Sequence, residues 1–435
     1  YIPTYTGPGH ASIYTGTTPK YHGIISNNWF DKEIKKTIYC VSDTLFESVG
    51  TQDSYSKVSP KRMKVSTVTD ELRMATQMRG KVIGIAIKDR GAALPAGHSA
   101  NAAFWFQGVQ EGNWVKSTFY MNELPRWVDK FNNSDASESY FKTWDTYYKI
   151  NTYVESGLDL NEFEGRFNGK QTATFPYELD ELKNLNNGFD ILKTTPFGNN
   201  LTTDFALATI EGEQLGEDDI TDFLAISYSS TDYIGHKFGV NSKEIEDAYI
   251  RLDKDVERLL NYLDEEVGNG QYTVFLTSDH GAVDVPAYLK SINIPADYFN
   301  STDFKSKINE FVTKKFKASG LIESISNNQI FLDRTSLDLL GLDLDDVQEA
   351  IVNEIINYKH IDTAFTATTM STVYFDTGIE AMLQMGFNQK RSGDVLYVLD
   401  PAVISYGRTG STHGSGFNYD THVPLLFYGY GINKG

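Results

Sequence analysis

Short, continuous apolar segments rich in β-branched residues constrain the fold of this chain more than any other feature. They lie at residues 81–88, 223–227, 272–276 and 423–428. An apolar run of this length, without alternation, is typical of a strand buried on both faces of a parallel sheet. Right-handed helical crossovers join such strands. The segments therefore predict an α/β fold with a mostly parallel central sheet flanked by helices.

One amphipathic helix is predicted between the second and third of these strands. Apolar residues recur there at three- and four-residue steps from Ile245 to Leu263, as on the buried face of a helix. Asn241 and Glu244 have the spacing of a capping box, and Gly268 provides a stop. The strand–helix–strand order supports a βαβ arrangement.

The 435 residues suggest one large domain, residues 1–435, that carries insertions. Two stretches, 104–200 and 285–400, are expected to form caps around a site. The second contains a predicted helix over 343–358 and predicted strands over 329–332, 372–375 and 395–399. The chain has no initiator Met and starts within a motif, so both ends are expected to be cut and no signal peptide is visible.

Composition excludes several classes of function. The balance of 39 Lys and Arg against 58 Asp and Glu gives a net charge of −19, so a nucleic-acid partner is not expected. No apolar run is long enough for a membrane span. The single cysteine, Cys40, excludes an intrachain disulfide and leaves His and Asp as the ligands for any zinc. Bound metal ions would supply the positive charge that an anionic substrate requires.

Candidate binding residues follow the ends of the predicted strands. In chain order they are Lys88 and Arg90, then Asp232 and His236, then Asp279 and His280. Open α/β sheets bind ligands at the carboxyl ends of their strands. The agreement of these positions therefore predicts a single site at one edge of the sheet.

The imidazole and carboxylate groups in this set favour a metal site. The spacing of Asp232 and His236 is by itself weak evidence for a metal site, and so is His413. Together with the adjacent pair Asp279 and His280, these residues make a metal site the better interpretation. Zinc suits these ligands and polarises an ester oxygen without redox chemistry, and manganese or iron is the alternative. The runner-up ligand is His422, and the histidines expected to be structural are His10, His22, His98 and His360.

A candidate nucleophile stands far upstream of the ligands. Thr6 is followed by Gly7-Pro8-Gly9, which suggests a tight turn that exposes the hydroxyl near a helix N-terminus. Coordination to a dication would lower the pKa of that hydroxyl. Thr6 could equally be a helix N-cap, and Thr4 is a competing nucleophile.

Two cations and an amide could bind the oxygens of a phosphoryl group. Lys88 and Arg90 are separated by one residue, so in extended backbone their side chains point the same way and could bind two oxygens together. A solvated loop is the alternative. Asn27 is a further donor, or an ordinary turn residue.

Taken in order, these motifs resemble those of the alkaline phosphatase superfamily. The resemblance is carried by the segment YIPTYTGPGHASIYTG at residues 1–16, by residues 22–24 and 27–29, and by KDRGAALPAGH at 88–98 with Phe-Trp-Phe at 104–106. The chain resembles the branch shared with the nucleotide pyrophosphatase/phosphodiesterases. Within it, the chain most resembles the flavobacterial-type, phosphate-irrepressible alkaline phosphatases with a threonine nucleophile. The similarity runs through nearly the whole chain.

The resemblance implies an alkaline-phosphatase-like core and a role for each matching position. Thr6 matches the nucleophile, in preference to Thr4. Asn27 matches a phosphoryl-oxygen donor. Lys88 and Arg90 match the pair that favours a dianionic monoester over a diester.

The resemblance also implies two zinc ions. One would be held by Asp232, His236 and His413, and the second by Asp279, His280 and Thr6. In the family the second zinc takes a further aspartate from a strand upstream of the nucleophile, and this sequence begins after that point.

The function expected on these grounds is a zinc-dependent phosphomonoesterase that acts through a covalent phosphothreonine. Small phosphate monoesters would be its partners, and a bacterial, periplasmic or secreted monomer is expected from the resemblance. A phosphodiesterase or nucleotide pyrophosphatase with the same two metals is one alternative. A catalytically impaired binding protein is another, should the upstream aspartate be truly absent. A sulfatase is disfavoured because Cys40 is not in a formylglycine motif.

Overall fold

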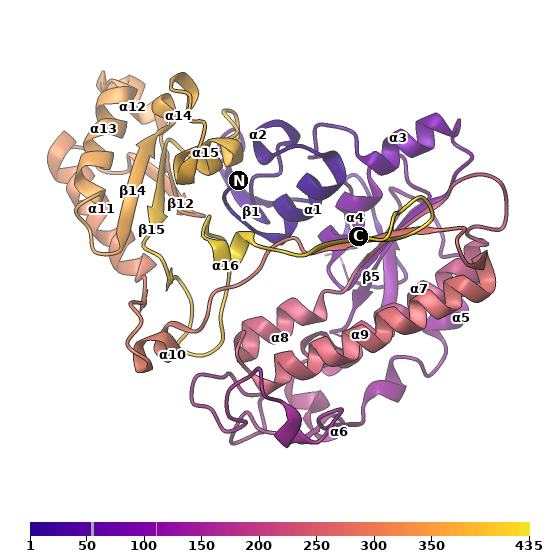
Figure 1. Cartoon of the computed structure of the whole chain (residues 1–435). Helices are drawn as coiled ribbons and strands as arrows, with labels where there is room; N and C mark the ends of the chain where they lie inside the picture. The colour runs from indigo at the N-terminus through magenta and orange to yellow at the C-terminus, as the bar shows by residue number, and fades with distance from the viewer. Residues whose placement is uncertain (54–55, 110) are drawn as a thin grey trace.

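The protein folds into two lobes that lie side by side (Figure 1). The computed structural model describes residues 1–53, 56–109 and 111–435. The larger lobe contains the central sheet, and the smaller lobe is built mainly from residues 297–404. The first residues of the chain pass between the lobes, where the amide of Ile2 donates to the carbonyl of Met382 at 3.0 Å.

The central sheet of the larger lobe has five strands in the order β3-β6-β5-β4-β9. β4 lies parallel to both β5 and β9, whereas β6 is antiparallel to β5 and to β3. Every residue of β4 is buried, as the apolar run predicted. The α/β prediction is confirmed. The strands are β3 (Ser48–Val49), β4 (Val82–Ala86), β5 (Ala102–Gln107), β6 (Asn113–Ser117) and β9 (Phe223–Ser227).

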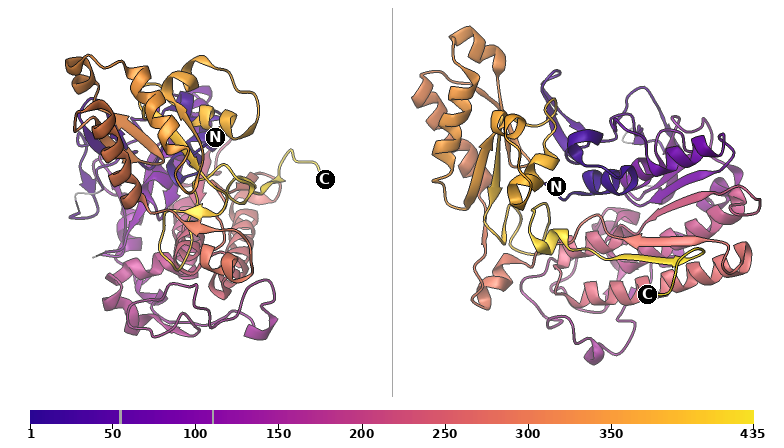
Figure 2. Two further views of the ribbon diagram at one scale, coloured as in Figure 1. Left: turned by 90° about the vertical axis from the view of Figure 1, so that its left-hand side faces the viewer. Right: turned by 45° about the horizontal axis from the view of Figure 1, so that its top comes forward.

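Helices cover both faces of this sheet (Figures 1 and 2). One face packs against α7 (Pro196–Glu213), α8 (Ser230–Phe238) and α9 (Lys243–Leu263), and the other against α1 (Thr6–Thr15) and α4 (Asp89–Ala96). A Cβ at Gly84 of β4 would lie 2.2 Å from the carbonyl oxygen of Ala92. A glycine is therefore required there for α4 to pack so closely on the strand that precedes it.

The third predicted strand forms, but not in the parallel sheet. β10 (Thr273–Thr277) pairs antiparallel with β17 (Leu425–Gly429), and the two strands make a separate ribbon (Figure 2). Residues 425–428 of β17 are exposed. An apolar run shows that a strand is favourable but does not specify its partner or direction, which is why the parallel assignment was wrong here.

The predicted amphipathic helix is α9, and its start differs from the expectation by one residue. Ser242 is the N-cap, because its side-chain oxygen accepts a hydrogen bond from the amide of Ile245 at 3.2 Å. Asn241 and Glu244 therefore do not form a capping box, and Glu244 lies inside the first turn. The helix ends at Leu263 and continues as a π-helical turn that closes at Gly268.

The smaller lobe has its own antiparallel sheet, in the order β12-β13-β15-β14, and its own hydrophobic core. The predicted strands over 329–332 and 395–399 form as β13 and β15, and the predicted helix forms as α13. The strand predicted over 372–375 is absent: Thr372 is the last residue of a helix that Thr366 caps by accepting from the amide of Thr369, and residues 373–375 form neither helix nor strand. The elements are β12 (Ile322–Ser326), β13 (Gln329–Leu332), β14 (Ile361–Thr366), β15 (Val395–Leu399), α11 (Ser301–Phe316), α12 (Arg334–Leu340), α13 (Leu344–Ile355) and α14 (Ala367–Thr372).

Further short strands and α-helices lie in the described part of the chain. They are β1 (Asn28–Asp31), β2 (Lys36–Tyr39), β7 (Thr143–Trp144), β8 (Tyr177–Glu178), β11 (Asp297–Tyr298), β16 (Val403–Ile404), α2 (Pro19–His22), α3 (Val68–Ala75), α5 (Arg126–Asn132), α6 (Leu179–Leu182), α10 (Pro286–Ser291), α15 (Gly378–Gly386) and α16 (Asn418–Thr421). Among the described residues, no helix is long and apolar enough to cross a bilayer. The division into a core with caps at 104–200 and 285–400 stays a prediction, and the first of these ranges includes most of β5 and all of β6.

One of the histidines that the sequence left as structural ties α3 to the end of α4. His98 Nδ1 lies 3.1 Å from Asp70 Oδ2, and Asp70 also accepts from the amide of Ser99 at 2.7 Å. The hydrogen bond to Asp70 raises the pKa of His98. The protonated form therefore stabilises the fold below the unfolded pKa of about 6.5, and this contribution is lost as the pH rises through the folded pKa.

The substitution His98→Gln is expected to lower the Tm by about 1 to 2 °C at pH 5.5, where the imidazole is charged. At pH 9 the loss should be smaller, because the neutral imidazole no longer gains from Asp70. Thermal unfolding of the variant and of the control His422→Gln, at an exposed position, checks this. An effect of His98→Gln that grows with pH would contradict the assignment.

Candidate active site

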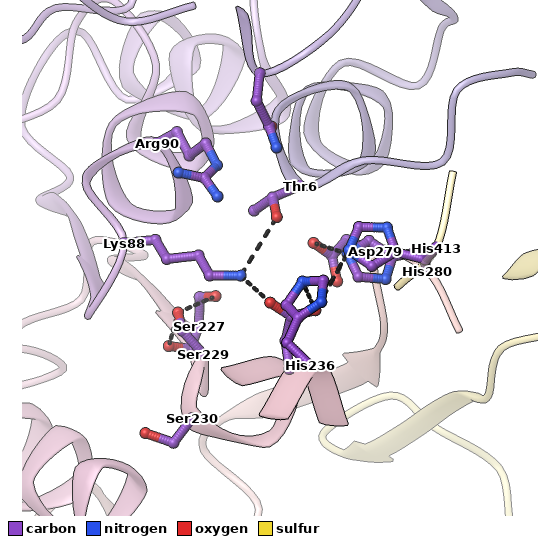
Figure 3. Close-up of polar contacts among 12 residues, drawn as sticks. Thr6, Lys88, Arg90, Ser227, Ser229, Ser230, His236, Asp279, His280 and His413 are labelled. Atoms are coloured by element: carbon purple, nitrogen blue, oxygen red, sulfur yellow. Dashed lines mark hydrogen bonds and ion pairs between the residues drawn. The ribbon is translucent and has the colours of Figure 1, made fainter. Parts of the chain in front are cut away.

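The predicted site residues come together where strands β4, β9 and β10 end (Figure 3). Thr6 begins α1, Lys88 and Arg90 lie at the turn into α4, and Asp232 and His236 are on α8. Asp279 and His280 follow β10, and His413 lies in the loop before α16. Segments far apart in sequence thus supply one site at the carboxyl edge of the strands, as predicted.

Asp232 is at the centre of the candidate metal-ligating groups. Its Oδ1 atom lies 3.4 Å from Nε2 of His236 and 3.4 Å from Nε2 of His413. Nε2 of His280 lies 3.9 Å from the same oxygen. Ligand atoms of Asp232, His280 and His413 all lie within 4.8 Å of one another, so a single ion could contact all three.

All three histidines present the same ring nitrogen to this cluster. In each, Nδ1 is placed to donate to a backbone carbonyl, which leaves the Nε2 lone pair facing Asp232. Nε2 of His280 is buried and has no hydrogen-bond partner, as expected of an atom that faces a metal position. The pairs are His236 with Ser411 (2.8 Å), His280 with Gly281 (2.9 Å) and His413 with Thr4 (2.6 Å).

The protonation states at neutral pH also suit a divalent metal. Burial acts to raise the pKa of Asp232, but Lys88 and His413 outweigh it and hold the pKa well below its usual value. Burial lowers the pKa of His280 to about 4. The site thus combines an ionised carboxylate with a neutral imidazole, the forms that coordinate zinc.

Asp279 lies on the other side of His280. Its Oδ2 atom is 3.4 Å from His280 Nε2 and 3.2 Å from Nδ1 of His10. A Cβ at Gly9 would lie 2.7 Å from the Cβ of Asp279, so a glycine is required for α1 to approach this carboxylate. His10 also contacts the hydroxyl of Ser227 at 3.0 Å. Its place one helical turn after Thr6 was the signal in the sequence that it lines the site.

Thr6 is the first residue of α1, and the N-cap is Tyr5. The alternative that Thr6 serves as the N-cap therefore does not hold. Its Oγ1 atom lies 3.5 Å from Nζ of Lys88, and both point into the same space in Figure 3. The hydroxyl of Thr4, in contrast, donates to the carbonyl of Ser415 at 2.9 Å. The geometry favours Thr6 over Thr4.

Asn27 lies beside the start of α1. Its Oδ1 atom accepts a hydrogen bond from the amide of Gly7 at 2.7 Å. A Cβ at Gly7 would approach that oxygen to 3.1 Å. Because Oδ1 is engaged, only the NH₂ group of Asn27 remains to bind a substrate oxygen.

Lys88 and Arg90 converge, but not through strand alternation. β4 ends at Ala86, Lys88 is the N-cap of α4, and Arg90 lies in its first turn. Lys88 is buried, forms an ion pair with Asp232, and lies 4.8 Å from the ring centroid of Tyr233. The solvated-loop alternative is therefore wrong for Lys88.

Arg90 is held by neighbours that the sequence did not reveal. Its Nη1 atom donates to the hydroxyl of Tyr39 at 3.0 Å, and that hydroxyl also bonds to Asp89. Nε of Arg90 is buried and has no partner. The guanidinium is thus oriented with donor capacity to spare for an anion.

The runner-up ligand, His422, is exposed at the end of α16. Its ring lies in none of the contacts that join the described site residues. Of the imidazoles weighed in the sequence, the structure therefore brings together His236, His280 and His413, with His10 behind them.

Comparisons with known proteins agree with this geometry. The chain matches the family described as type I phosphodiesterase / nucleotide pyrophosphatase over residues 1–423. It is 41% identical over 438 residues to alkaline phosphatase PafA of Elizabethkingia meningoseptica, which covers 100% of this chain and 80% of that protein. It is 42% identical over 444 residues to a Myroides odoratus protein named calcium-transporting ATPase, with 100% and 80% covered.

The crystal structure of PafA superposes with a TM-score of 0.95 at 40% identity, covering 100% of this chain and 83% of that one. A PafA mutant has also been solved, with changes at a threonine, an asparagine, a lysine and an arginine. The chain belongs to the type I phosphodiesterase/nucleotide pyrophosphatase family of the alkaline phosphatase superfamily, within which it is an enzyme of the alkaline phosphatase type.

Proposed function

We propose that the chain is a two-zinc alkaline phosphatase that hydrolyses phosphate monoesters through a covalent phosphothreonine at Thr6. The observation that carries the proposal is the position of the Thr6 hydroxyl. It stands at the N-terminus of α1, 3.5 Å from Lys88 Nζ, beside a cluster of Asp and His side chains. The N-terminal amides of a helix favour an anion at this position.

The donor atoms fit two adjacent metal positions. His280 Nε2 lies 3.4 Å from the carboxylate of Asp279 and 3.9 Å from that of Asp232, so the two carboxylates flank it. We assign Asp232, His236 and His413 to one zinc, and Asp279, His280 and Thr6 to the other. When bound, the ions would lower the pKa of the Thr6 hydroxyl and stabilise the leaving oxygen.

The protein side chains supply the nucleophile and bind the oxygens of the phosphoryl group. The Thr6 hydroxyl loses its proton, and its oxygen attacks phosphorus in line with the ester oxygen. The bond between phosphorus and the ester oxygen breaks, and that oxygen takes up a proton and leaves as the alcohol. Water then attacks the phosphothreonine and releases inorganic phosphate, which restores the hydroxyl. The NH₂ group of Asn27, the ammonium of Lys88 and the guanidinium of Arg90 bind the non-bridging oxygens, where charge develops.

A monoester is favoured over a diester because the two cations match a dianion. The second ester group of a diester would occupy the space into which Lys88 and Arg90 point, and would leave their charge uncompensated. The PafA mutant supports the assignment. The residue types changed in it match those of Thr6, Asn27, Lys88 and Arg90 in the same order, and its lysine and arginine are also separated by one residue.

We further propose a monomer that acts in the bacterial periplasm or outside the cell. This extends the resemblance to secreted alkaline phosphatases. Size-exclusion chromatography with light scattering and fractionation of cells test the two statements.

Metal content tests the two-zinc assignment. We expect about two zinc ions per chain by mass spectrometry of the purified protein. Asp232→Asn should lower zinc content by about half or more, and kcat/KM for p-nitrophenyl phosphate by about 100-fold, because a central ligand is weakened. The control Asp253→Asn, at an exposed position, should retain both.

Two results would contradict the assignment. Full zinc content and activity in Asp232→Asn would remove this residue from the site. An unmodified protein without stoichiometric zinc and without activity would favour the alternative of an impaired binding protein.

A further inference from the structure

A pair of buried glutamates lies outside the active site, where residues 157–165 pack against the start of α9. Glu164 is 7% exposed and Glu244 is fully buried. No hydrogen bond of normal distance and angle reaches either oxygen of Glu164 or Oε2 of Glu244. The side chain of Asn161 is near, but it does not offset the rise in the pKa of Glu164 that burial causes. The hydroxyl of Tyr177 donates to the other oxygen of Glu244. An ionised carboxylate left unpaired in a protein interior is strongly unfavourable.

The fold provides donors for another buried acid on the same helix. Asp247, one turn after Glu244, is also fully buried. It accepts hydrogen bonds from Trp144 Nε1 at 2.8 Å, Tyr147 N at 2.7 Å, Tyr153 Oη at 2.5 Å and Arg251 Nε at 2.7 Å. The unsatisfied oxygens of Glu164 and Glu244 are therefore not a general feature of buried acids in this region.

Nearby cations do not neutralise the pair directly. Within the described parts of the chain, no Lys, Arg or His nitrogen lies within 4.0 Å of either carboxylate. The ammonium of Lys243 donates to the carbonyl of Tyr153 at 2.9 Å, and that of Lys170 to the carbonyl of Pro176 at 2.7 Å. Burial, followed by repulsion from Glu244, raises the pKa of Glu164. The pair requires a positive partner or a proton.

We propose that Glu164 and Glu244 bind a calcium ion that fastens residues 157–165 to the N-terminus of α9. The free donors are carboxylate oxygens, the ligands of hard cations, and the nitrogen and sulfur ligands that favour zinc are absent from the pair. Calcium accepts six to eight oxygens at about 2.3–2.6 Å in irregular geometry. No third acidic side chain among the described residues completes a compact set with the pair, so water and backbone carbonyls fill the other positions.

The location of the pair links this ion to the catalytic elements. The loop that carries Glu164 contacts α8 through the Gly165 amide, which donates to the carbonyl of Lys237 at 2.8 Å. In the same loop, the carbonyl of Phe163 accepts a hydrogen bond from the amide of Gly410 at 2.9 Å. Lys237 is adjacent to His236, and Gly410 precedes the segment of His413. Calcium at the pair therefore supports two segments that hold metal ligands, without touching the substrate.

The experiment measures calcium and zinc together in the zinc-loaded enzyme, and then its thermal unfolding as calcium chloride is added. We expect one calcium per chain beyond the zinc. Removal and readdition of calcium should move the Tm by about 2 to 5 °C, because the ion binds only the folded state. Magnesium should move it little, because it requires regular octahedral geometry and sheds water reluctantly.

Three variants locate the site. Glu164→Gln and Glu244→Gln should lose the calcium and the calcium-dependent rise in Tm while retaining zinc. Glu162→Gln, at an exposed position two residues from Glu164, should behave as the unmodified protein does. Because Gln keeps the shape of Glu, a loss of calcium together with retained zinc is not explained by general misfolding.

Several results would overturn the proposal. If the variants fail to fold, the unmodified protein still tests the proposal. Absence of calcium from it, together with a Tm that added calcium does not change, excludes the site. An equal response to magnesium excludes a calcium-selective site. A Tm for Glu164→Gln that is higher than that of the unmodified protein and independent of calcium would assign the pair to a shared proton.

Discussion

Replacing Thr6 with alanine is expected to lower kcat/KM for p-nitrophenyl phosphate by about 10⁴-fold or more. The reason is that the competing hydroxyl weighed in the sequence, that of Thr4, is engaged with the carbonyl of Ser415. Zinc content should fall only in part, because Asp and His side chains still hold the ions. Steady-state kinetics with zinc in excess, beside metal analysis, measure both effects.

The matched controls are Thr4→Val and Thr6→Ser. Thr4→Val removes the hydrogen bond to Ser415 but keeps the backbone carbonyl that His413 contacts, so less than about a tenfold loss is expected. Thr6→Ser keeps a hydroxyl and should retain far more activity than Thr6→Ala. Activity of Thr6→Ala near that of the unmodified enzyme would show that water attacks directly and that no phosphothreonine forms.

Replacing Lys88 and Arg90 together with alanine should change specificity as well as rate. Each charged donor to the transferred group is worth about 10²- to 10³-fold, so the monoester kcat/KM should fall by about 10³-fold or more. Hydrolysis of methyl p-nitrophenyl phosphate, a diester, should fall by about tenfold or less, because these cations are matched to the dianion. The measured quantity is the ratio of the two kcat/KM values.

The control for this pair is Lys254→Ala, an exposed lysine on α9 that pairs with Glu257. It removes one positive charge from the surface and should leave the ratio unchanged. Equal losses on both substrates in the double variant would remove the role assigned to Lys88 and Arg90, and would favour the phosphodiesterase alternative.

The parts of the fold that depend on local sequence could be predicted. β9 forms over Phe223–Ser227, the segment predicted, and α9 follows the apolar pattern. The partner of β10 could not be predicted, because the pairing of a strand depends on distant segments rather than on its own residues. Likewise, the N-cap of α9 was misplaced because Asn241 and Ser242 are both good capping residues.

For the candidate site too, the residues in local motifs could be predicted, whereas those whose place depends on distant contacts could not. Asp279 and His280 were identifiable because they directly follow an apolar run at a strand end. Tyr39 was not, since its role depends on a contact with Arg90, which is distant in sequence. For His10 the sequence signal was limited to its place one helical turn after Thr6. The side chains that we propose to contact metals or substrate lie in compact motifs, whereas those that orient them are dispersed along the chain.

The most direct test of the central claim is the monoester-to-diester ratio of the zinc-loaded protein. Hydrolysis of p-nitrophenyl phosphate and of methyl p-nitrophenyl phosphate is measured on the same preparation at alkaline pH. A two-zinc phosphomonoesterase with Lys88 and Arg90 in the phosphoryl site predicts a kcat/KM for the monoester that exceeds that for the diester by about 100-fold or more. A preference for the diester would contradict it and identify a phosphodiesterase on the same fold.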